Sequence, residues 1–421
     1  MNKFQEYILQ NIYNGRISEI IDITEKFFHQ KASDLPPEIK ADVLCFVMCI
    51  TRDDLDEVIA THSEVSRTIK GHAFEVVFDS MMAINGIPCI EIGGDMDIDR
   101  IINKYTLQLK TPYVNGCSEN IVSYKTHKTH GSKSQIQSID YYHKVEDFAD
   151  YLIGLVSYEP FRVLIVPKES LPRVDGYPEY IQSPMYLRAN DKQTINNFEQ
   201  LGIQKSMYFP TNLLTPEINE SLPISSRLLH LKSDYILRAI FIKENFRIWD
   251  MNMRGFIREH ILLKYLIANK IKTYPTNITG LERSEKCDLV LKNHYNQFVR
   301  FQIKGLTWNG TIFNGISTTI DCETQLSRGR VNDHPTQSRL YKITDFEYLI
   351  IAIEPPYSNI LSIHTFDKYD YFWNFYCISM SQLRKHPTYT NRVFSHQHIL
   401  YKELQKYRID SSWIGIWAAE L

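Results

Sequence analysis

Two sets of polar residues, each able to hold a divalent metal ion, occur in the same order at two places in this chain. In the first set Glu75 follows Gly71 as Gly-x-x-x-Glu, Asp97 begins an apolar segment, and Gln108 and Lys110 lie on the next one. The second set repeats them later in the chain as Gly255, Glu259, Asp288, Gln302 and Lys304. These are the groups needed to hold a metal ion beside a phosphodiester.

Hydrolysis of a phosphodiester requires neutralisation of the charge that builds on the phosphoryl oxygens, and it requires an activated water. Mg²⁺ does both, and it prefers carboxylates, carbonyl oxygens and water as ligands. Gln108 and Lys110 are two residues apart, so on a strand both side chains point to one face, and the same holds for Gln302 and Lys304. Each lysine would then lie beside the metal, where it can orient the attacking water.

The elements that must position the first set are a helix followed by short strands. Apolar residues share one face over residues 63–85, and Gly86 is a typical helix stop. Short strands are expected after it, with Asn103-Lys104 as the turn between the second and third. They cover residues 88–92, 98–102, 105–110, 151–156 and 162–166, with a polar loop over 113–138 between the third and fourth.

The second set lies in the same succession of elements. An amphipathic helix is expected over residues 253–270, then a hairpin formed by 288–291 and 298–303. A polar loop over 309–338 leads to a strand over 348–352. The repeated order of helix, hairpin, loop and strand indicates that a fold has been duplicated.

This pattern resembles the PD-(D/E)xK nuclease superfamily, in the variant in which Gln replaces the second acid, as in some restriction and Mrr-like endonucleases. The resemblance implies that Mg²⁺ is the cofactor, with Mn²⁺ as an alternative. It assigns the catalytic lysines to Lys110 and Lys304, and metal binding to the other polar residues of each set. These are Glu75, Asp97 and Gln108 in the first copy, and Glu259, Asp288 and Gln302 in the second.

The chain departs from the family pattern in two respects. The proline that precedes the aspartate is replaced by Met96 in one copy and by Cys287 in the other. The glutamine is neutral, so metal affinity must depend on the aspartate and the helix glutamate. This puts in doubt whether both copies bind metal well.

The resemblance implies an α/β chain with two tandem restriction-endonuclease-like domains, each with a mixed central sheet flanked by helices. An N-terminal helical region over residues 1–69 precedes the first nuclease-like domain, which covers 70–185. Residues 186–250 form a linker or a small recognition region, and the second nuclease-like domain covers 251–421.

Other interpretations of these residues remain open. Asp97 lies in a cluster with Asp95 and Asp99 that also suits a polar turn, and Asp95 is the second choice of metal ligand. Glu75 alone would be an ordinary solvated helix residue. Lys110 and its counterpart would be ordinary strand-end lysines if the repeat were ignored.

The overall charge of −2 excludes a whole-molecule basic field, so contacts with DNA must come from local patches. The candidates are basic residues in the two polar loops, which are equally compatible with solvated loops. They are Lys125, Lys128 and Lys133 in the first loop, and Arg328 and Arg330 in the second.

The 421 residues are enough for two or three domains. Seven cysteines are scattered without a Cys-x-x-Cys pair, which argues against a structural zinc site and favours a reducing compartment. The N-terminus has no apolar signal core, and the longest apolar runs are too short for a membrane span. We therefore expect a cytoplasmic protein with no membrane partner.

The expected function is Mg²⁺-dependent hydrolysis of double-stranded DNA by a type II restriction-type or related defence endonuclease. Two sites on one chain would let a monomer cut both strands, whereas a single-site enzyme usually needs a homodimer. One alternative is a DNA-binding protein in which one or both nuclease folds are inactive. Another is a nuclease that acts on RNA or on branched DNA.

Overall fold

The computed structural model describes residues 3–11, 17–92, 98–113, 121–126, 139, 142–189, 195–210, 213–242, 246–276, 287–306, 319–325, 340–354 and 373–417. The chain has a mixed α/β fold, and it divides into two compact units. The first-copy unit, which contains the first set of polar residues, comprises Gln30–Ala41 and Ile59–Ile248. The second-copy unit comprises Met1–His29, Asp42–Val58 and Trp249–Leu421.

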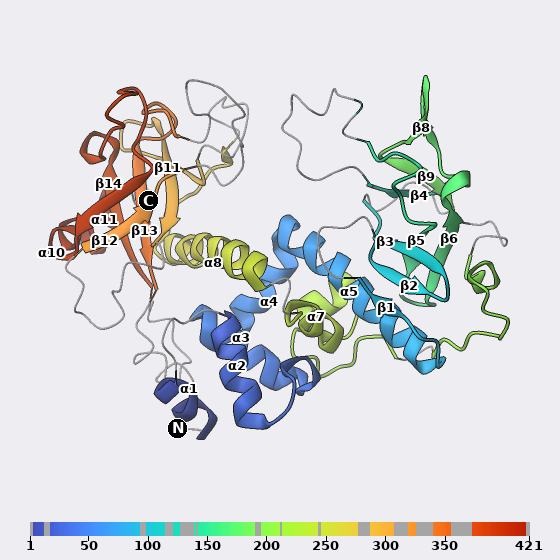
Figure 1. Cartoon of the computed structure of the whole chain (residues 1–421). Helices are drawn as coiled ribbons and strands as arrows, with labels where there is room; N and C mark the ends of the chain where they lie inside the picture. The colour runs from blue at the N-terminus through green and yellow to red at the C-terminus, as the bar shows by residue number, and fades with distance from the viewer. Residues whose placement is uncertain are drawn as a thin grey trace. The chain divides into compact units, whose positions relative to one another are not determined.

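The sheet of the first-copy unit has the strand order β1-β2-β3-β5-β6 (Figure 1). Strands β2 and β3 form an antiparallel hairpin, β3 and β5 run parallel, and β6 returns antiparallel to β5. The parallel pair makes this a mixed sheet, as the sequence predicted. The strands are β1 (Ile90–Glu91), β2 (Arg100–Ile102), β3 (Tyr105–Lys110), β5 (Tyr151–Ser157) and β6 (Arg162–Pro167).

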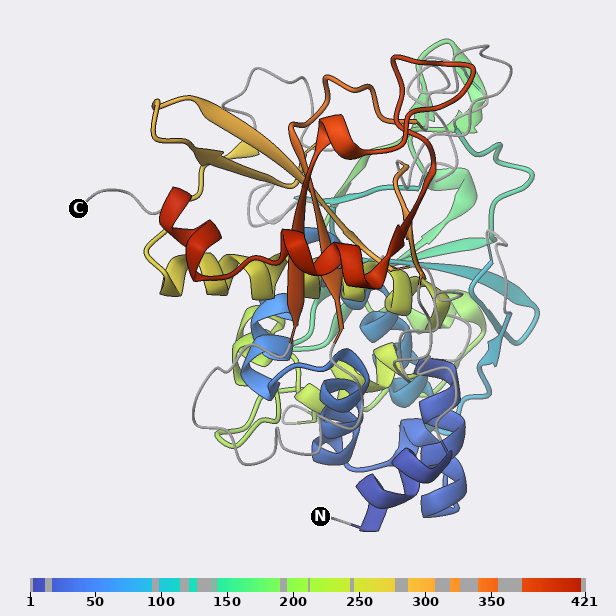
Figure 2. The same cartoon turned by 90° about the vertical axis from the view of Figure 1, so that its left-hand side faces the viewer.

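The sheet of the second-copy unit has the order β10-β11-β13-β14. Its strands are β10 (Leu289–Lys292), β11 (Phe298–Gly305), β13 (Tyr348–Ile353) and β14 (Asn374–Ser379). Again a hairpin is followed by a parallel pair and an antiparallel return, so β10, β11, β13 and β14 correspond to β2, β3, β5 and β6. Figure 2 shows these orange and red strands with the yellow helix α8 crossing near their lower ends.

The correspondence extends to single hydrogen bonds. The Asp150 carboxylate accepts a hydrogen bond from the Thr106 backbone N–H at 3.0 Å, and the Glu347 carboxylate accepts one from the Arg300 N–H at 2.7 Å. Both acids immediately precede the central parallel strand and contact the strand that carries Gln-x-Lys. The sequence repeat is therefore a repeat of tertiary structure.

Each unit also has a two-stranded ribbon that begins after the Gln-x-Lys strand. In the first-copy unit β4 (Ile121–Tyr124) pairs with β9 (Met185–Arg188), and in the second-copy unit β12 (Thr319–Glu323) pairs with β15 (His396–Leu400). The first-copy unit has a further small hairpin, β7 (Arg173–Val174) with β8 (Tyr177–Ile181).

A long helix carries the glutamate of each set. Helix α5 (Ser63–Ile84) buries Phe74 and Phe78, and it packs against β3 and against α7 (Ser233–Ile240). Its counterpart α8 (Phe246–Ala268) buries Ile257 and the apolar residues that follow on the same face. Both helices were predicted from their apolar periodicity, and both are confirmed. Shorter helices are α6 (Pro223–Leu229), α10 (Tyr401–Leu404) and α11 (Ser411–Trp417).

The N-terminal helical region predicted over residues 1–69 is divided between the two units. Lys40 forms an ion pair with Asp234 of α7 at 2.7 Å in the first-copy unit, whereas Asp54 bonds to His260 of α8 in the second-copy unit. The chain from 186 to 248, predicted to be a linker or a small recognition region, falls within the first-copy unit. These helices are α1 (Lys3–Asn11), α2 (Ile17–Phe28), α3 (Pro37–Met48) and α4 (Arg52–Thr61).

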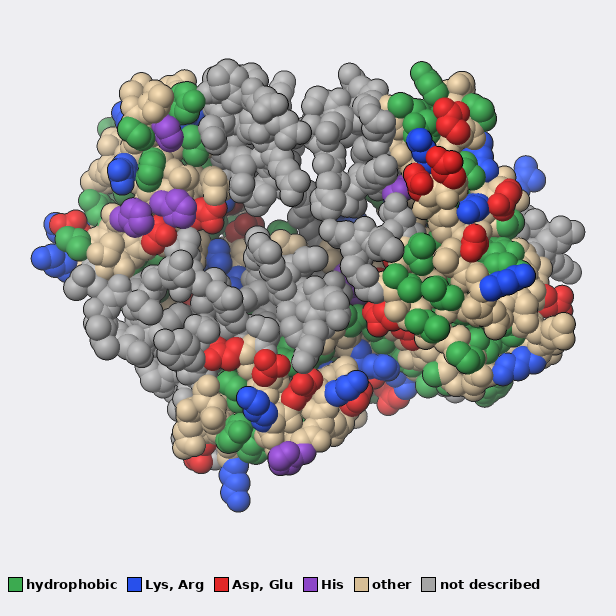
Figure 3. Space-filling model, in the orientation of Figure 1, with side chains coloured by type: hydrophobic (Ala, Val, Ile, Leu, Met, Phe, Trp, Pro, Cys, Tyr) green, Lys and Arg blue, Asp and Glu red, His purple; other side chains and the backbone are tan. Residues whose placement is uncertain are grey.

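The surface carries charges of both signs. On the face drawn in Figure 3, Lys and Arg side chains alternate with Asp and Glu side chains over the described residues. None of the helices in the described part of the chain is long and apolar enough to cross a membrane.

Candidate active sites

The first-copy site is built around Asp99, which lies immediately before β2. Its Oδ2 accepts a hydrogen bond from the backbone N–H of Leu109 at 2.6 Å, and its own N–H donates to the Leu107 carbonyl at 2.8 Å. These two bonds fix the carboxylate beside β3, between Gln108 and Lys110. Burial raises the pKa of Asp99, and the positive charge of Lys110 opposes this effect.

The second-copy site repeats this arrangement around Asp288. Its Oδ2 accepts a hydrogen bond from the Ile303 N–H at 2.8 Å, and its N–H donates to the Phe301 carbonyl at 2.8 Å. The Gln302 side-chain amide donates to the same Oδ2. Burial raises the pKa of Asp288 to about 6, and the charge of Lys304 is the main effect that opposes it.

Asp99 therefore occupies the place that corresponds to Asp288, a place for which Asp97 was the prediction from the sequence. Asp97 and Asp95 lie outside the described residues. The strand register gives the reason. Arg100 pairs with Leu107, and Leu289 pairs with Phe301, so the next pair along each hairpin sets the aspartate opposite the glutamine. Counting back from each glutamine through the hairpin would have found this aspartate.

The two glutamines share an unusual feature. Gln108 is 4% exposed and Gln302 is 3% exposed, and the buried Oε1 atom of each finds no hydrogen-bond partner among the described residues. Leaving a buried acceptor unpaired costs about 1–3 kcal/mol. A cation bound in each site would satisfy the glutamine Oε1 of that site. Mg²⁺ takes carboxylate and amide oxygens as ligands, so the residues of both sites fit this ion.

The catalytic lysines predicted from the sequence lie with the aspartates in both copies. The charge of Lys110 acts on Asp99 and on Glu75, which brings two residues of the predicted set, Lys110 and Glu75, together with Asp99. The charge of Lys304 acts on Asp288, and its Nζ lies 5.4 Å from the centre of the Tyr341 ring.

The helix glutamates differ between the copies. Glu75 lies 3.4 Å from His72 and 3.4 Å from Arg100, and although burial would raise its pKa, these groups and Lys110 lower it. Glu259 is half-buried at the matching place on α8, where its charge acts on the neighbouring Arg258. Glu75 is thus linked by charge to the lysine and the arginine of its own site.

Arginines occupy the helix side of the second-copy site. Arg254 forms an ion pair with Glu354 at the end of β13. The Arg258 guanidinium lies against Gly305, where an added Cβ would come within 2.2 Å of Arg258 Cζ. Burial lowers the pKa of Arg258. In the first copy the positions that match Arg254, Arg258, Gly305 and Glu354 hold Lys70, Phe74, Thr111 and Ser157.

A third cluster, which the sequence did not reveal, joins α4 and α8. Asp54, Glu57 and His260 place potential metal-ligand atoms within 4.8 Å of one another. The ammonium of Lys264 lies 2.6 Å from Asp54 and 3.1 Å from Glu57. The carboxylates thus already have a cation between them, so this cluster is an ion-pair network that holds the two helices together.

Most of the predicted phosphate-binding residues lie outside the described part of the chain: Lys128, Lys133, Arg328 and Arg330. Lys125 is described, and its Nζ lies 4.8 Å from the centre of the Tyr113 ring.

No family model, curated protein or solved structure matches this chain. Its function has to be inferred from the geometry of its own residues.

Proposed function

We propose that this chain is a Mg²⁺-dependent DNA endonuclease with two PD-(D/E)xK-like sites, of restriction type or a related defence type. One observation carries the proposal. In both units a half-buried aspartate accepts a hydrogen bond from the N–H that follows a glutamine, the glutamine Oε1 is buried without a hydrogen-bond partner among the described residues, and a lysine comes two residues after the glutamine. The presence of this combination in both copies is hard to explain by packing alone.

The residues of each site have distinct roles in this proposal. Asp99 with Gln108, and Asp288 with Gln302, supply the oxygens that hold Mg²⁺. When bound, Mg²⁺ neutralises charge on the phosphate and makes water a better nucleophile. The backbone N–H bonds keep each aspartate in place, and the lysine ammonium orients the attacking water. In the first copy Glu75 adds a further carboxylate.

The direct test is incubation of the purified protein with unmethylated phage DNA and with supercoiled plasmid, with and without Mg²⁺. We expect discrete fragments that depend on Mg²⁺. The Lys110→Ala and Lys304→Ala variants should each leave nicked circles, because each retains one working site. Retention of DNA without cleavage in any metal would refute the nuclease proposal and favour a DNA-binding protein. Faster cleavage of RNA or of branched DNA would change the substrate class.

One observation favours a second candidate, in which only the first copy cuts. The ion pair of Arg254 with Glu354 and the guanidinium of Arg258 crowd the helix side of the second copy. If this copy only binds DNA, Lys304→Ala will cut as the wild type does, and Lys110→Ala will be inert.

A further inference from the structure

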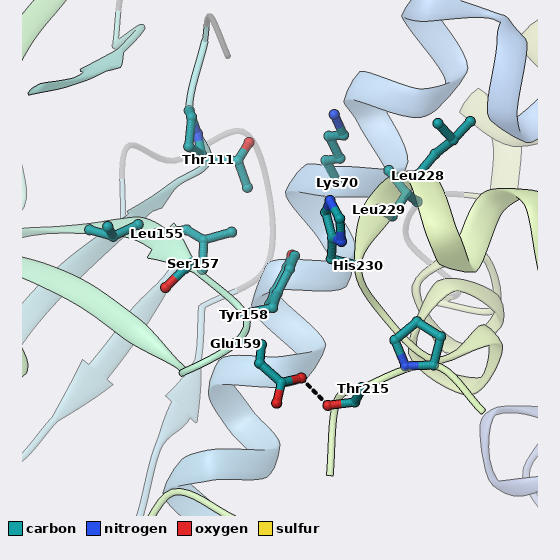
Figure 4. Close-up of a pocket in the computed structure, with 13 residues that line it drawn as sticks. Lys70, Thr111, Leu155, Ser157, Tyr158, Glu159, Thr215, Leu228, Leu229 and His230 are labelled. Atoms are coloured by element: carbon teal, nitrogen blue, oxygen red, sulfur yellow. Dashed lines mark hydrogen bonds between the residues drawn. The ribbon is translucent and has the colours of Figure 1, made fainter. Parts of the chain in front are cut away.

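A cavity of about 600 Å³ lies beside the first-copy site, within one unit (Figure 4). Thr111, which lines it, directly follows Lys110, and Lys70, which also lines it, directly precedes Gly71 on α5. Ser157 contributes from the end of β5, the strand parallel to β3. The cavity thus opens at the carboxyl ends of two parallel strands, where ligands of α/β sheets commonly bind.

The lining of this cavity combines flat apolar surface with a few polar groups. Leu228 and Leu229 of α6 form an apolar wall, and Lys70 provides a cation. The Tyr158 hydroxyl is buried and makes no hydrogen bond among the described residues. Figure 4 shows its ring extending toward His230. A ligand with a polar edge would satisfy this hydroxyl, which is otherwise costly to bury.

We propose that this cavity holds one unstacked nucleotide of the DNA, next to the phosphodiester at the first-copy site. This proposal rests on the proposed function of that site. A nucleobase has apolar faces and a polar edge, which match the leucine wall and the Tyr158 hydroxyl. Lys70 lies where it can neutralise the phosphate of the same nucleotide. The volume falls in the range of pockets that enclose a small ligand.

The second copy provides an internal comparison. The positions that match Lys70 and Ser157 are Arg254 and Glu354, which pair with each other. The position that matches Thr111 is Gly305, and the Arg258 guanidinium lies against it. In the second copy the charged side chains of Arg254, Arg258 and Glu354 thus lie at or against positions that match the lining of the cavity in the first copy. The chain should therefore have one such nucleotide site, and not two.

The first test is calorimetric titration of the full chain with thymidine 3′,5′-bisphosphate, with Ca²⁺ in place of Mg²⁺. We expect one bound nucleotide per chain. Tyr158→Phe should weaken binding about threefold to tenfold and Lys70→Ala about tenfold or more, since the second removes a charged donor. Lys104→Ala, on the hairpin turn, should have no effect. Wild-type affinity in both cavity variants would overturn the proposal.

The second test asks whether the nucleotide belongs to DNA. A labelled duplex with one unpaired nucleotide should bind about tenfold more tightly than the fully paired duplex, because an unpaired base is cheap to extrude. Leu228→Trp, at a cavity position that is 56% exposed, should abolish this preference, and Ile218→Trp, at a position 99% exposed outside the cavity, should keep it. If the chain binds the free bisphosphate but does not prefer the duplex with an unpaired nucleotide, the claim that the bound nucleotide belongs to DNA is overturned. The binding readouts need no cleavage, so they fail or succeed independently of the nuclease proposal.

Discussion

At the scale of single residues, Asp99 and Asp97 are the alternative metal ligands of the first-copy site. Asp99 is held by backbone hydrogen bonds at the place that matches Asp288. Asp99→Asn should lower Mg²⁺-dependent nicking by about a hundredfold or more, since it removes a charged ligand. Asp97→Asn should cut close to the wild-type rate. Nicking is best measured in the Lys304→Ala background, where only the first copy acts. The reverse result would restore Asp97 as the ligand.

The unpartnered glutamine oxygens give a prediction that needs no enzyme activity. Mg²⁺ that binds only the folded state should raise the melting temperature of the wild type. Gln108→Met removes the buried Oε1, so without metal it should be neutral or slightly stabilising. Its gain in melting temperature with Mg²⁺ should be smaller than that of the wild type. An equal gain in both proteins would show that Gln108 does not bind the ion.

At the scale of helices and strands, a prediction concerns how α8 packs against β11. Gly305→Ala would place a methyl group against the Arg258 guanidinium, and overpacking of this kind costs about 1–3 kcal/mol. Gly255 on α8 is a matched control, because a Cβ there meets nothing within 4 Å. Gly255→Ala should stabilise by about 0.5–1 kcal/mol through helix propensity. Urea unfolding measures both. If both variants change the free energy of unfolding equally, the Arg258 side chain moves away from the added methyl group at no cost.

The ion-pair network between α4 and α8 predicts how stability depends on pH. Burial would raise the pKa of Asp54, but hydrogen bonds from His260, Lys264 and Thr51 hold it well below its usual value. A lowered pKa in the folded state stabilises the fold above the unfolded value of about 4, and this contribution is lost as the pH falls further. Asp54→Asn should lose about 2 kcal/mol at pH 7. The difference from the wild type should shrink between about pH 4 and pH 2. A constant difference would contradict this.

Local patterns predicted the elements better than the connections between them. The helices and strands around both sites were predicted because their apolar periodicities are strong. Lys110 and Lys304 were found because strand residues two apart share a face. The sequence-based choice of Asp97 matched it to Asp288 as the residue that begins a strand, but strand β2 (Arg100–Ile102) is shorter than β10 (Leu289–Lys292), and the register aligns Asp99 with Asp288. The contacts of the N-terminal helical region with the rest of the chain were not predicted, because long-range ion pairs, such as Lys40 with Asp234, leave no local signal.

At the scale of the whole molecule, the proposed nuclease function makes the presence of two copies on one chain decisive for how a duplex is cut. A monomer with two working sites cuts both strands by itself, whereas single-site enzymes need two chains. Equal amounts of Lys110→Ala and Lys304→Ala separate these cases. If each chain acts alone, the mixture will produce nicked circles first and linear DNA only through independent second nicks. If chains act in pairs, with the first copy of one chain opposite the second copy of the other, mixed dimers will restore rapid linearisation, because only they combine an intact first copy with an intact second copy. The ratio of linear to nicked plasmid at early times, measured over a range of protein concentrations, distinguishes the two.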